Sequence, residues 1–275
     1  MQMSCAWKEL LSILPDRLRR DVDQLGRDKL SELRLRTGQT AELVLADRVC
    51  YAGARVTACE LEHLVYAVTQ YSPWAASTAA KGYLSAPGGH RIGMCGEVIM
   101  KDGQVTGIRS ISSLCIRIAR DIPGVAYSAG TVRESTVVLG APGWGKTTLL
   151  RDLSRTVAKD RTVCVIDDRG ELFPQDIRRG YRMDVLTGAP KEEGIQIALR
   201  CMGPEFIAVD EITAAEDARS VLQAHGSGVK LLATAHAGSL EDLRRRPVYR
   251  DLLSNGVFSY ALILHSDKSY TRERI

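Results

Sequence analysis

The sequence predicts an α/β fold, a parallel sheet with helices on both faces, preceded by a smaller α+β domain. Two observations predict this fold class. In the second half of the chain, four apolar strand runs alternate with helical segments, the pattern of a parallel sheet covered on both faces. In the first 120 residues, alternating strands separated by turn residues predict hairpins instead. The length of 275 residues provides for two such domains.

The composition is that of an ordinary globular chain, 45% hydrophobic and 25% charged, which excludes a disordered or fibrous protein. The formal net charge of +4 is too small to require nucleic acid as a partner. The seven cysteines include no CxxC pair, which argues against a disulfide framework or zinc site and favours a reduced, cytoplasmic compartment. Because the apolar runs are shorter than the roughly 18–20 residues that span a bilayer, we expect no direct membrane span.

The elements of the amino-terminal half follow from the spacing of its apolar residues. Residues 7–20 show helical spacing interrupted by Pro15, which predicts one or two short helices. Beyond them the pattern predicts strands at 32–36 and 41–45, a helix around 61–68, a strand at 91–100, a turn at Asp102-Gly103 and alternating strands through 118.

Residues 121–133 are the stretch where turn residues accumulate without a periodic pattern, so we predict a linker there. The predicted domains are therefore an α+β domain over 1–120 and an α/β domain over 134–275. Within the second domain, strands are expected at 136–139, 163–166, 206–209 and 231–235.

A phosphate-binding motif follows the first of these strands. Residues 140–147 read GAPGWGKT and fill every fixed position of GxxxxGK[S/T], the Walker A motif, and a run of good helix formers follows over 148–157. In such a loop the glycines let backbone N–H groups surround the β-phosphate, while the lysine reaches the β- and γ-phosphates. The domain is therefore predicted to be a P-loop NTPase. The predicted nucleotide-binding residues are Gly140, Pro142, Gly143, Trp144, Gly145, Lys146, Thr147 and Thr148.

Two carboxylates end the strand at 206–209. At the carboxyl end of a strand near the phosphate loop, Asp210 is placed to hold Mg²⁺ together with the hydroxyl of Thr147, and Glu211 to activate an attacking water. A paired Asp-Glu favours hydrolysis over transfer to a bound hydroxyl group, so a nucleoside triphosphate and Mg²⁺ are the expected ligands.

Two further strands end in polar residues. The strand at 163–166 leads into an acidic box, Asp167 to Glu171, although acidic turns after strands are also common without a function. The strand at 231–235 ends in Thr234 and His236, either of which could contact the γ-phosphate; a lone histidine is more often a capping or core residue. Their position beside one phosphate loop strengthens the functional interpretation of each.

In this order the motifs resemble the secretion and type IV pilus ATPase superfamily and, within it, a branch that acts at stage III of sporulation. The resemblance rests on the phosphate loop, the acidic box, Asp210-Glu211 with the preceding residues 200–205, and the histidine box at 233–239. It also rests on segments outside the site, and it covers nearly the whole chain; these segments are 32–36, 82–83, 88–93, 110–113 and 242–247.

The resemblance implies a cytoplasmic ATPase, with a P-loop domain of the RecA/AAA-like type that binds ATP and Mg²⁺. It also implies that the protein forms a ring hexamer and associates peripherally with membranes through partners. It would power or assemble a secretion-like channel at the forespore membranes, docked on an integral membrane platform protein. It also implies that arginines of the amino-terminal domain complete the site. Arg109 and Arg117 are the matching candidates, and Arg91 is a weaker candidate. Many relatives carry Gly-Glu where this chain has Asp210-Glu211. Both Glu211 and Glu171 therefore stay candidates for the water-activating residue.

Two other functions fit the same motifs. A nucleic-acid-handling P-loop ATPase is suggested by the arginines at 178–179 and 244–246, but the aromatic content of 5% and the lack of an appended binding motif argue against it. We therefore expect no nucleic-acid partner. A nucleotide-bound scaffold with negligible turnover is the second alternative, and the intact acidic pair favours an enzyme.

Overall fold

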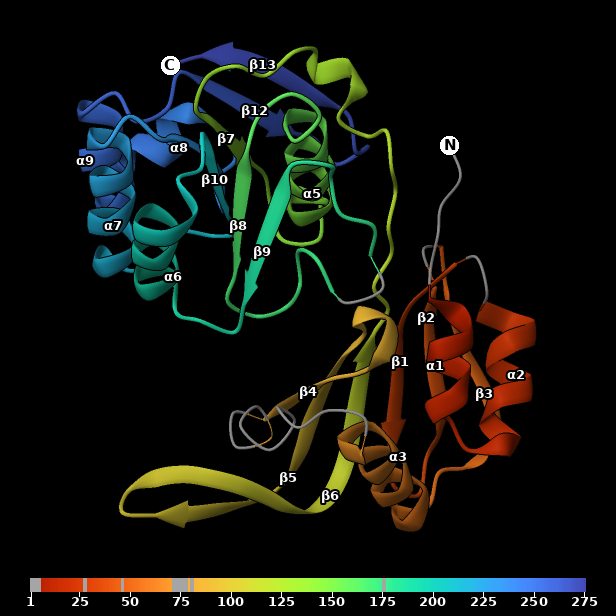
Figure 1. Cartoon of the computed structure of the whole chain (residues 1–275). Helices are drawn as coiled ribbons and strands as arrows, with labels where there is room; N and C mark the ends of the chain where they lie inside the picture. Colours follow the sequence, from red (N-terminus) through yellow and green to blue (C-terminus); the bar gives the residue numbers. More distant parts are fainter. Residues whose placement is uncertain (1–5, 27–28, 46, 71–78, 80–81, 175–176) are drawn as a thin grey trace. The chain divides into compact units, whose positions relative to one another are not determined.

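The computed structural model describes residues 6–26, 29–45, 47–70, 79, 82–174 and 177–275 (Figure 1). The chain divides into two compact units. The amino-terminal unit comprises the described residues up to Arg120 together with Pro174 and Ile177, and the larger unit comprises Asp121–Phe173 and Arg178–Ile275. Each unit is described by itself.

The amino-terminal unit is built on a six-stranded antiparallel sheet with the order β3-β2-β1-β6-β5-β4. Its elements are α1 (Trp7–Ile13), α2 (Asp16–Gly26), β1 (Leu30–Arg36), β2 (Thr40–Leu45), β3 (Val49–Arg55), α3 (Ala58–Gln70), β4 (Tyr83–Ser85), η1 (Pro87–Gly89), β5 (Arg91–Lys101) and β6 (Gln104–Arg117). The break between the two expected helices falls at Pro15, as predicted, because proline supplies no N–H for helix continuation.

The core of this unit is formed by alternate side chains along its strands. Leu33 and Leu35 of β1 are fully buried, while the intervening Arg34 is partly exposed and pairs with Glu32. The buried side chains join one cluster with the apolar stripes of the helices, for example Leu10 of α1. The unit is thus a sheet with one face packed on helices, the α+β arrangement predicted from the sequence.

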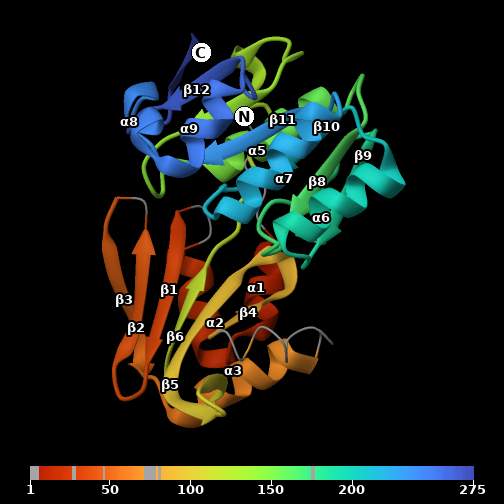
Figure 2. The same ribbon diagram turned by 90° about the vertical axis from the view of Figure 1, so that its left-hand side faces the viewer.

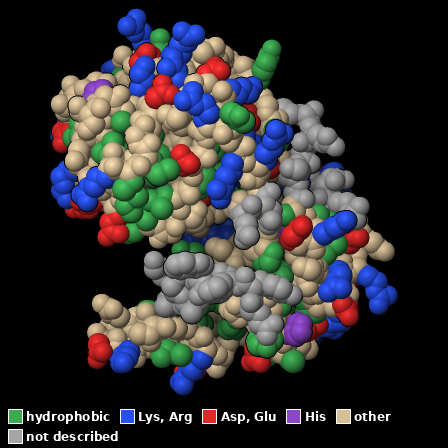
Figure 3. Space-filling model, viewed as in Figure 1, with side chains coloured by type: hydrophobic (Ala, Val, Ile, Leu, Met, Phe, Trp, Pro, Cys, Tyr) green, Lys and Arg blue, Asp and Glu red, His purple; other side chains and the backbone are tan. Residues whose placement is uncertain are grey.

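The β5–β6 hairpin continues past its neighbours as a two-stranded ribbon. Its pairing with β1 and β4 stops near the base of the hairpin, and the register shifts at Gly96, opposite Ser110, whose φ is +50°. Exposed apolar side chains lie on the ribbon, namely Val98, Met100 and Val105, and apolar surface is visible there at the lower left of Figure 3. The ribbon therefore presents apolar groups to solvent.

The larger unit contains a seven-stranded sheet with the order β13-β12-β7-β11-β10-β8-β9, parallel except for the β12–β13 pair. Its elements are η2 (Tyr127–Ala129), β7 (Thr136–Leu139), α5 (Lys146–Val157), β8 (Val163–Asp167), β9 (Met183–Thr187), α6 (Lys191–Ile197), η3 (Ala198–Met202), β10 (Phe206–Val209), α7 (Ala215–Gly226), β11 (Lys230–Ala235), α8 (Leu240–Arg245), α9 (Pro247–Ser254), β12 (Tyr260–Leu264) and β13 (Tyr270–Arg274). The four expected strands are present as β7, β8, β10 and β11. The strands β9, β12 and β13 were not predicted.

Helices cover both faces of this sheet, as the sequence predicts (Figure 2). Alternate strand residues such as Val137 and Ile207 join one core cluster with side chains of α6, α7 and α9. The helix α5 contacts β7, β8 and β11 but contributes no residue to that cluster, so it covers the opposite face. Because both faces are covered, the strands β7, β8 and β10 are buried at every position and mostly apolar, rather than alternating.

Residues 121–133, interpreted from the sequence as a linker, group with the larger unit, and we call them the connector. The carboxylate of Asp152 on α5 accepts the N–H groups of Gly124 and Ala126, each at 2.9 Å. The carboxylate of Asp121 pairs with Arg155 of α5 at 2.7 Å. The connector is thus fastened to the helix that begins at the phosphate loop.

Among the helices of the described ranges, none combines the length and apolar character needed to cross a membrane.

Candidate nucleotide-binding site

The phosphate loop connects β7 to α5, and its glycines explain its path. Gly143 and Gly145 have φ values of +75° and +102°, conformations that side-chain-bearing residues rarely adopt. The position of Gly140 favours glycine for a different reason, because a Cβ there would lie 3.1 Å from the Cβ of Leu264, a tight contact. The loop leads directly into the first turn of α5, and the N–H groups of a first helical turn have no acceptor within the helix, so they can bind an anion.

Lys146, the first residue of α5, is buried with 7% of its surface exposed. Its Nζ donates to the carbonyl of Ala141 at 3.0 Å and lies 3.0 Å from Nδ1 of His236. Burial lowers the pKa of Lys146, and the carboxylates of Asp210 and Glu211 oppose that shift. The amino group is therefore held beside the phosphate loop by two hydrogen-bond acceptors, the Ala141 carbonyl and Nδ1 of His236.

His236 links the lysine to a carboxylate. Since Nδ1 accepts from Lys146, the ring proton belongs on Nε2, which lies 3.0 Å from Oε1 of Glu211. In this tautomer the Nε2–H group donates to Oε1 of Glu211. A continuous chain of polar contacts thus runs from Lys146 through His236 to Glu211.

Asp210 connects two threonines of neighbouring segments. Its Oδ2 accepts the hydroxyl of Thr147 at 2.9 Å, and its Oδ1 accepts the hydroxyl of Thr234 at 2.5 Å. The Thr234 oxygen in turn accepts the N–H of Glu211 at 2.9 Å, which fixes Glu211 at a φ of +52°. Hydroxyl and carboxylate oxygens are the ligands that Mg²⁺ prefers, so Thr147 and Asp210 fit a magnesium ion.

The acidic box is organised by its first residue. Asp167 is buried and accepts three backbone N–H groups, from Glu171 at 2.8 Å, Leu172 at 3.0 Å and Phe173 at 2.9 Å. Burial raises the pKa of Asp167, and the hydrogen bonds from Phe173 and Leu172 oppose the rise. Asp167 therefore shapes the loop that carries Glu171, while Arg151 of α5 donates to the carbonyl of Glu171 at 2.8 Å.

The predicted arginines belong to the other unit. Arg109 and Arg117 both lie on β6. Arg109 pairs with Glu97 at 2.6 Å, and Arg117 lies 3.8 Å from Glu32. These contacts place them within the amino-terminal sheet, and their role at a nucleotide stays a prediction.

The remaining predicted residues lie in the loop or in the first turn of α5. Pro142 and Gly143 are exposed, Trp144 is half-buried, and Thr148 lies in the first turn of α5. Sequence analysis did not single out Lys268, whose Nζ donates to the carbonyl of Gly143 at 2.7 Å. No motif in the sequence points to Lys268, because it follows a short Ser-Asp turn and precedes an exposed strand.

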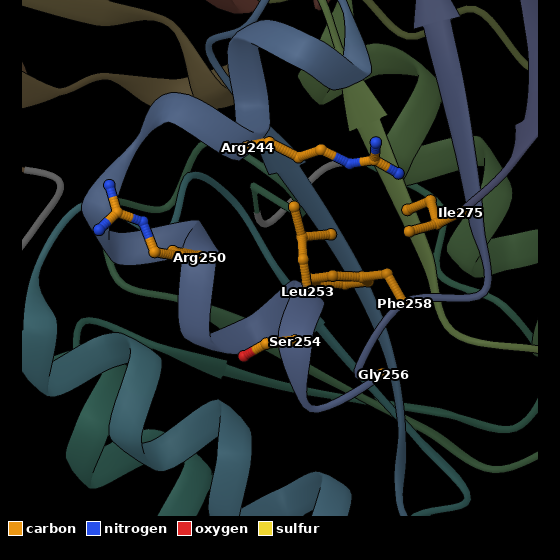
Figure 4. Close-up of a pocket in the computed structure, with 7 residues that line it drawn as sticks. All are labelled: Arg244, Arg250, Leu253, Ser254, Gly256, Phe258 and Ile275. Atoms are coloured by element: carbon orange, nitrogen blue, oxygen red, sulfur yellow. The ribbon is translucent and has the colours of Figure 1, made fainter.

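The same unit also has a separate pocket of about 380 Å³ on α8 and α9 (Figure 4). Its lining residues are Arg244, Arg250, Leu253, Ser254, Gly256, Phe258 and Ile275. None of the residues predicted to bind nucleotide lines it, so we do not assign the nucleotide to this pocket.

Solved structures share this architecture. The Legionella pneumophila ATPase DotB aligns over 95% of this chain and 81% of its own, with a TM-score of 0.59 and 19% sequence identity. The pilus retraction motor PilT, solved with bound ADP, aligns over 96% of this chain and 81% of its own, with a TM-score of 0.63 and 14% identity. At these identities the likeness establishes the fold alone. The fold and the phosphate loop therefore define a P-loop protein with the architecture of secretion and pilus ATPases, which confirms the predicted fold class.

The chain belongs to the family described as Sporulation stage III, protein AA, which matches residues 6–274. It is 32% identical over 281 residues to Stage III sporulation protein AA of Bacillus subtilis (strain 168), covering 94% of this chain and 91% of the relative. The resemblance drawn from the motifs is thereby confirmed.

Proposed function

We propose that this protein is a Mg²⁺-dependent ATPase that hydrolyses ATP by in-line attack of water on the γ-phosphate. The observation that carries the proposal is the connected set of contacts from the phosphate loop to two strand ends, Lys146–His236–Glu211 on one side and Thr147–Asp210 on the other. In this set an amino group, a metal-binding pair and a candidate base lie beside one phosphate loop, which supports nucleotide hydrolysis there.

Each group has a distinct task in the proposed reaction. The loop N–H groups and Lys146 bind and orient the phosphates, which brings the γ-phosphate into line with the attacking water. Thr147 and Asp210 would hold magnesium, which when bound neutralises charge on the phosphate oxygens. The Glu211 carboxylate accepts the proton of the attacking water. Its geometry is fixed by the Nε2–H of His236 and by its own backbone bond to Thr234.

We assign the water-activating role to Glu211 rather than Glu171. Glu211 belongs to the contact chain that includes the phosphate-loop lysine, whereas Glu171 follows β8, which β11 and β10 separate from β7 in the sheet. Among the described residues, the backbone of Glu171 is anchored by Asp167 and Arg151.

Glu211→Gln should bind ATP with nearly native affinity but hydrolyse it about 100- to 10,000-fold more slowly, because the amide cannot accept a proton. Glu171→Gln is the matched control and should lose much less activity. Phosphate release and equilibrium binding of a fluorescent ATP analogue, measured on both variants, test the assignment. A greater loss in Glu171→Gln would reverse the two roles. Negligible turnover by the native chain in its assembled form would favour a scaffold instead.

The wider setting proposed for this activity follows from the family. The protein would work in the cytoplasm as a ring hexamer, peripherally attached to membranes through an integral membrane platform protein. There it would power or assemble a secretion-like channel at the forespore membranes. Within the ring, hydrolysis would rotate the two units against each other, with Arg109 and Arg117 completing the site.

The mass of the protein in solution tests the ring directly. With a non-hydrolysable ATP analogue and Mg²⁺, light scattering or analytical ultracentrifugation should detect an assembly of about six chains. Repeated head-to-tail contacts that close into a ring give an assembly with a fixed number of chains. A strict monomer at high concentration, both with and without the analogue, would contradict the ring mechanism.

A further inference from the structure

The carboxyl-terminal hairpin lies against the phosphate loop, although neither the motifs nor the proposed reaction involves it. The strand β12 pairs in parallel with β7, with Ile263 opposite Leu139. Because parallel strands end at the same edge of a sheet, the turn after β12 emerges beside the loop after β7. There Leu264 packs against Gly140, and Lys268 reaches the loop.

The turn holds Lys268 in a defined position. Lys268 has a φ of +69°, and its N–H donates to the carbonyl of His265 at 3.1 Å. The N–H of His265 donates to the carbonyl of Ser269 at 2.9 Å, which closes the hairpin. Asp267 accepts both the N–H and the hydroxyl of Ser269, at 2.9 and 2.6 Å. These hydrogen bonds order the backbone of the turn. Less conformational entropy is therefore lost when the Lys268 side chain contacts the phosphate loop.

The contact acts on one peptide group of the phosphate loop. The Nζ of Lys268 donates to the carbonyl of Gly143, and the other end of the same planar unit is the N–H of Trp144. That N–H donates to the carbonyl of Ala141 over a long distance, 3.3 Å. The space where a Cβ on Gly143 would lie is open for 4 Å, so side-chain packing does not hold the loop there.

We propose that Lys268 is a positioning residue of the phosphate loop, which orients the Gly143–Trp144 peptide so that its N–H is directed to a bound phosphate. The carboxyl-terminal hairpin is then part of the nucleotide site. This inference rests on the nucleotide binding proposed above. It predicts an effect on binding of any phosphate chain that occupies the loop, ADP as well as ATP, because the peptide is positioned before the nucleotide arrives.

The test uses the full chain with substitutions at Lys268. Lys268→Gly removes the amino group and suits a φ of +69°, so a loss cannot come from strain in the turn. It should weaken binding of both ADP and a non-hydrolysable ATP analogue by about 3- to 10-fold, as expected for the net contribution of one ordinary hydrogen bond. KM for ATP should rise by a similar factor while kcat changes little. Lys268→Arg, which keeps the cation, should recover most of the affinity.

The matched control is Lys101→Gly, which removes an exposed hairpin lysine from the amino-terminal unit and should bind both nucleotides as the native chain does. If Lys146→Ala abolishes binding but Lys268→Gly binds both nucleotides normally, the inference is wrong and the proposed function stands. If only the ATP analogue is weakened, Lys268 contacts the γ-phosphate directly and does not position the loop. If the native chain binds neither nucleotide, the proposed function fails and the inference with it.

Discussion

Replacing Lys146 with alanine is expected to weaken the binding of ATP and ADP by at least about 100-fold and to abolish measurable hydrolysis. The side chain is buried at the mouth of the loop and already donates to two acceptors, the Ala141 carbonyl and His236. A bound phosphate would replace neutral acceptors with charged ones. Hydrogen bonds to charged groups contribute about 1.5–3 kcal/mol each, and two of them correspond to roughly 100- to 10,000-fold in affinity.

The fold should survive this change, because alanine in the first turn of α5 leaves no buried charge behind. Titration with a fluorescent ATP analogue gives the affinity, and thermal unfolding checks the fold. Lys159→Ala, at an exposed position just beyond the same helix, is the control and should bind as the native chain does. Native affinity in the Lys146 variant would contradict the whole site.

The pH dependence of nucleotide binding provides a second test of the role of Lys146. The amino group binds phosphate in its charged form, and burial lowers the pKa of Lys146 below its usual 10.5. As the pH rises through that lowered pKa, the charge is lost. Affinity in the native chain should therefore begin to fall below pH 10.5, and the Lys146→Ala variant should not show this fall.

The central strands of the larger unit were predictable because their sequences carry the physical cause of their structure. A strand buried on both faces is mainly apolar, and β7, β8, β10 and β11 each contain such an apolar run. The strands at the edges could not be found in this way. β13 is almost entirely exposed and rich in charge, and β9 is only partly buried.

The strand β12 was missed for another reason. Its five residues are nearly all buried, but a short apolar run does not distinguish a strand from a segment of a buried helix. Without β12 there is no reason to place Lys268 beside the phosphate loop. The loop, Asp210 and His236 could be located from the sequence because each follows a recognisable strand, whereas contacts made by a distant turn depend on sheet order.

The connector shows the same limit. Its turn residues, Asp121 and Gly124 among them, look like those of a solvated linker, and Arg151, Asp152 and Arg155 look like surface charges of an amphipathic helix. In the structure the two segments bury each other, and Asp121, Arg151 and Asp152 are at most 8% exposed. Local pattern does not reveal such burial, because it depends on which segment packs against the helix.

Asp152→Ala is expected to be among the most destabilising substitutions in the larger unit. The carboxylate accepts two connector N–H groups, those of Gly124 and Ala126, and its other oxygen lies 3.6 Å from Arg155. Alanine would leave both N–H groups without this acceptor. It would also change the net charge of the cluster formed by Asp121, Asp152, Arg151 and Arg155 from zero to +1. Removing one partner from a buried charge cluster costs about 3–5 kcal/mol. Thermal unfolding should record a fall of roughly 6–20 °C in Tm, at about 2–4 °C per kcal/mol for a unit of this size.

Two variants separate the buried cluster from a general effect of removing an acid. Asp152→Asn keeps an oxygen that can accept from the connector and should lose clearly less stability than alanine. Asp160→Ala removes an exposed acid just after the same helix and should change the free energy of unfolding by less than about 0.5 kcal/mol. Equal stability of the Asp152→Ala and Asp160→Ala variants would mean that the connector is not fastened to α5. If the order of stability is as expected, the helix that carries Lys146 at its first turn is also the helix that anchors the connector, so a movement of α5 on nucleotide binding would pull directly on residues 121–126.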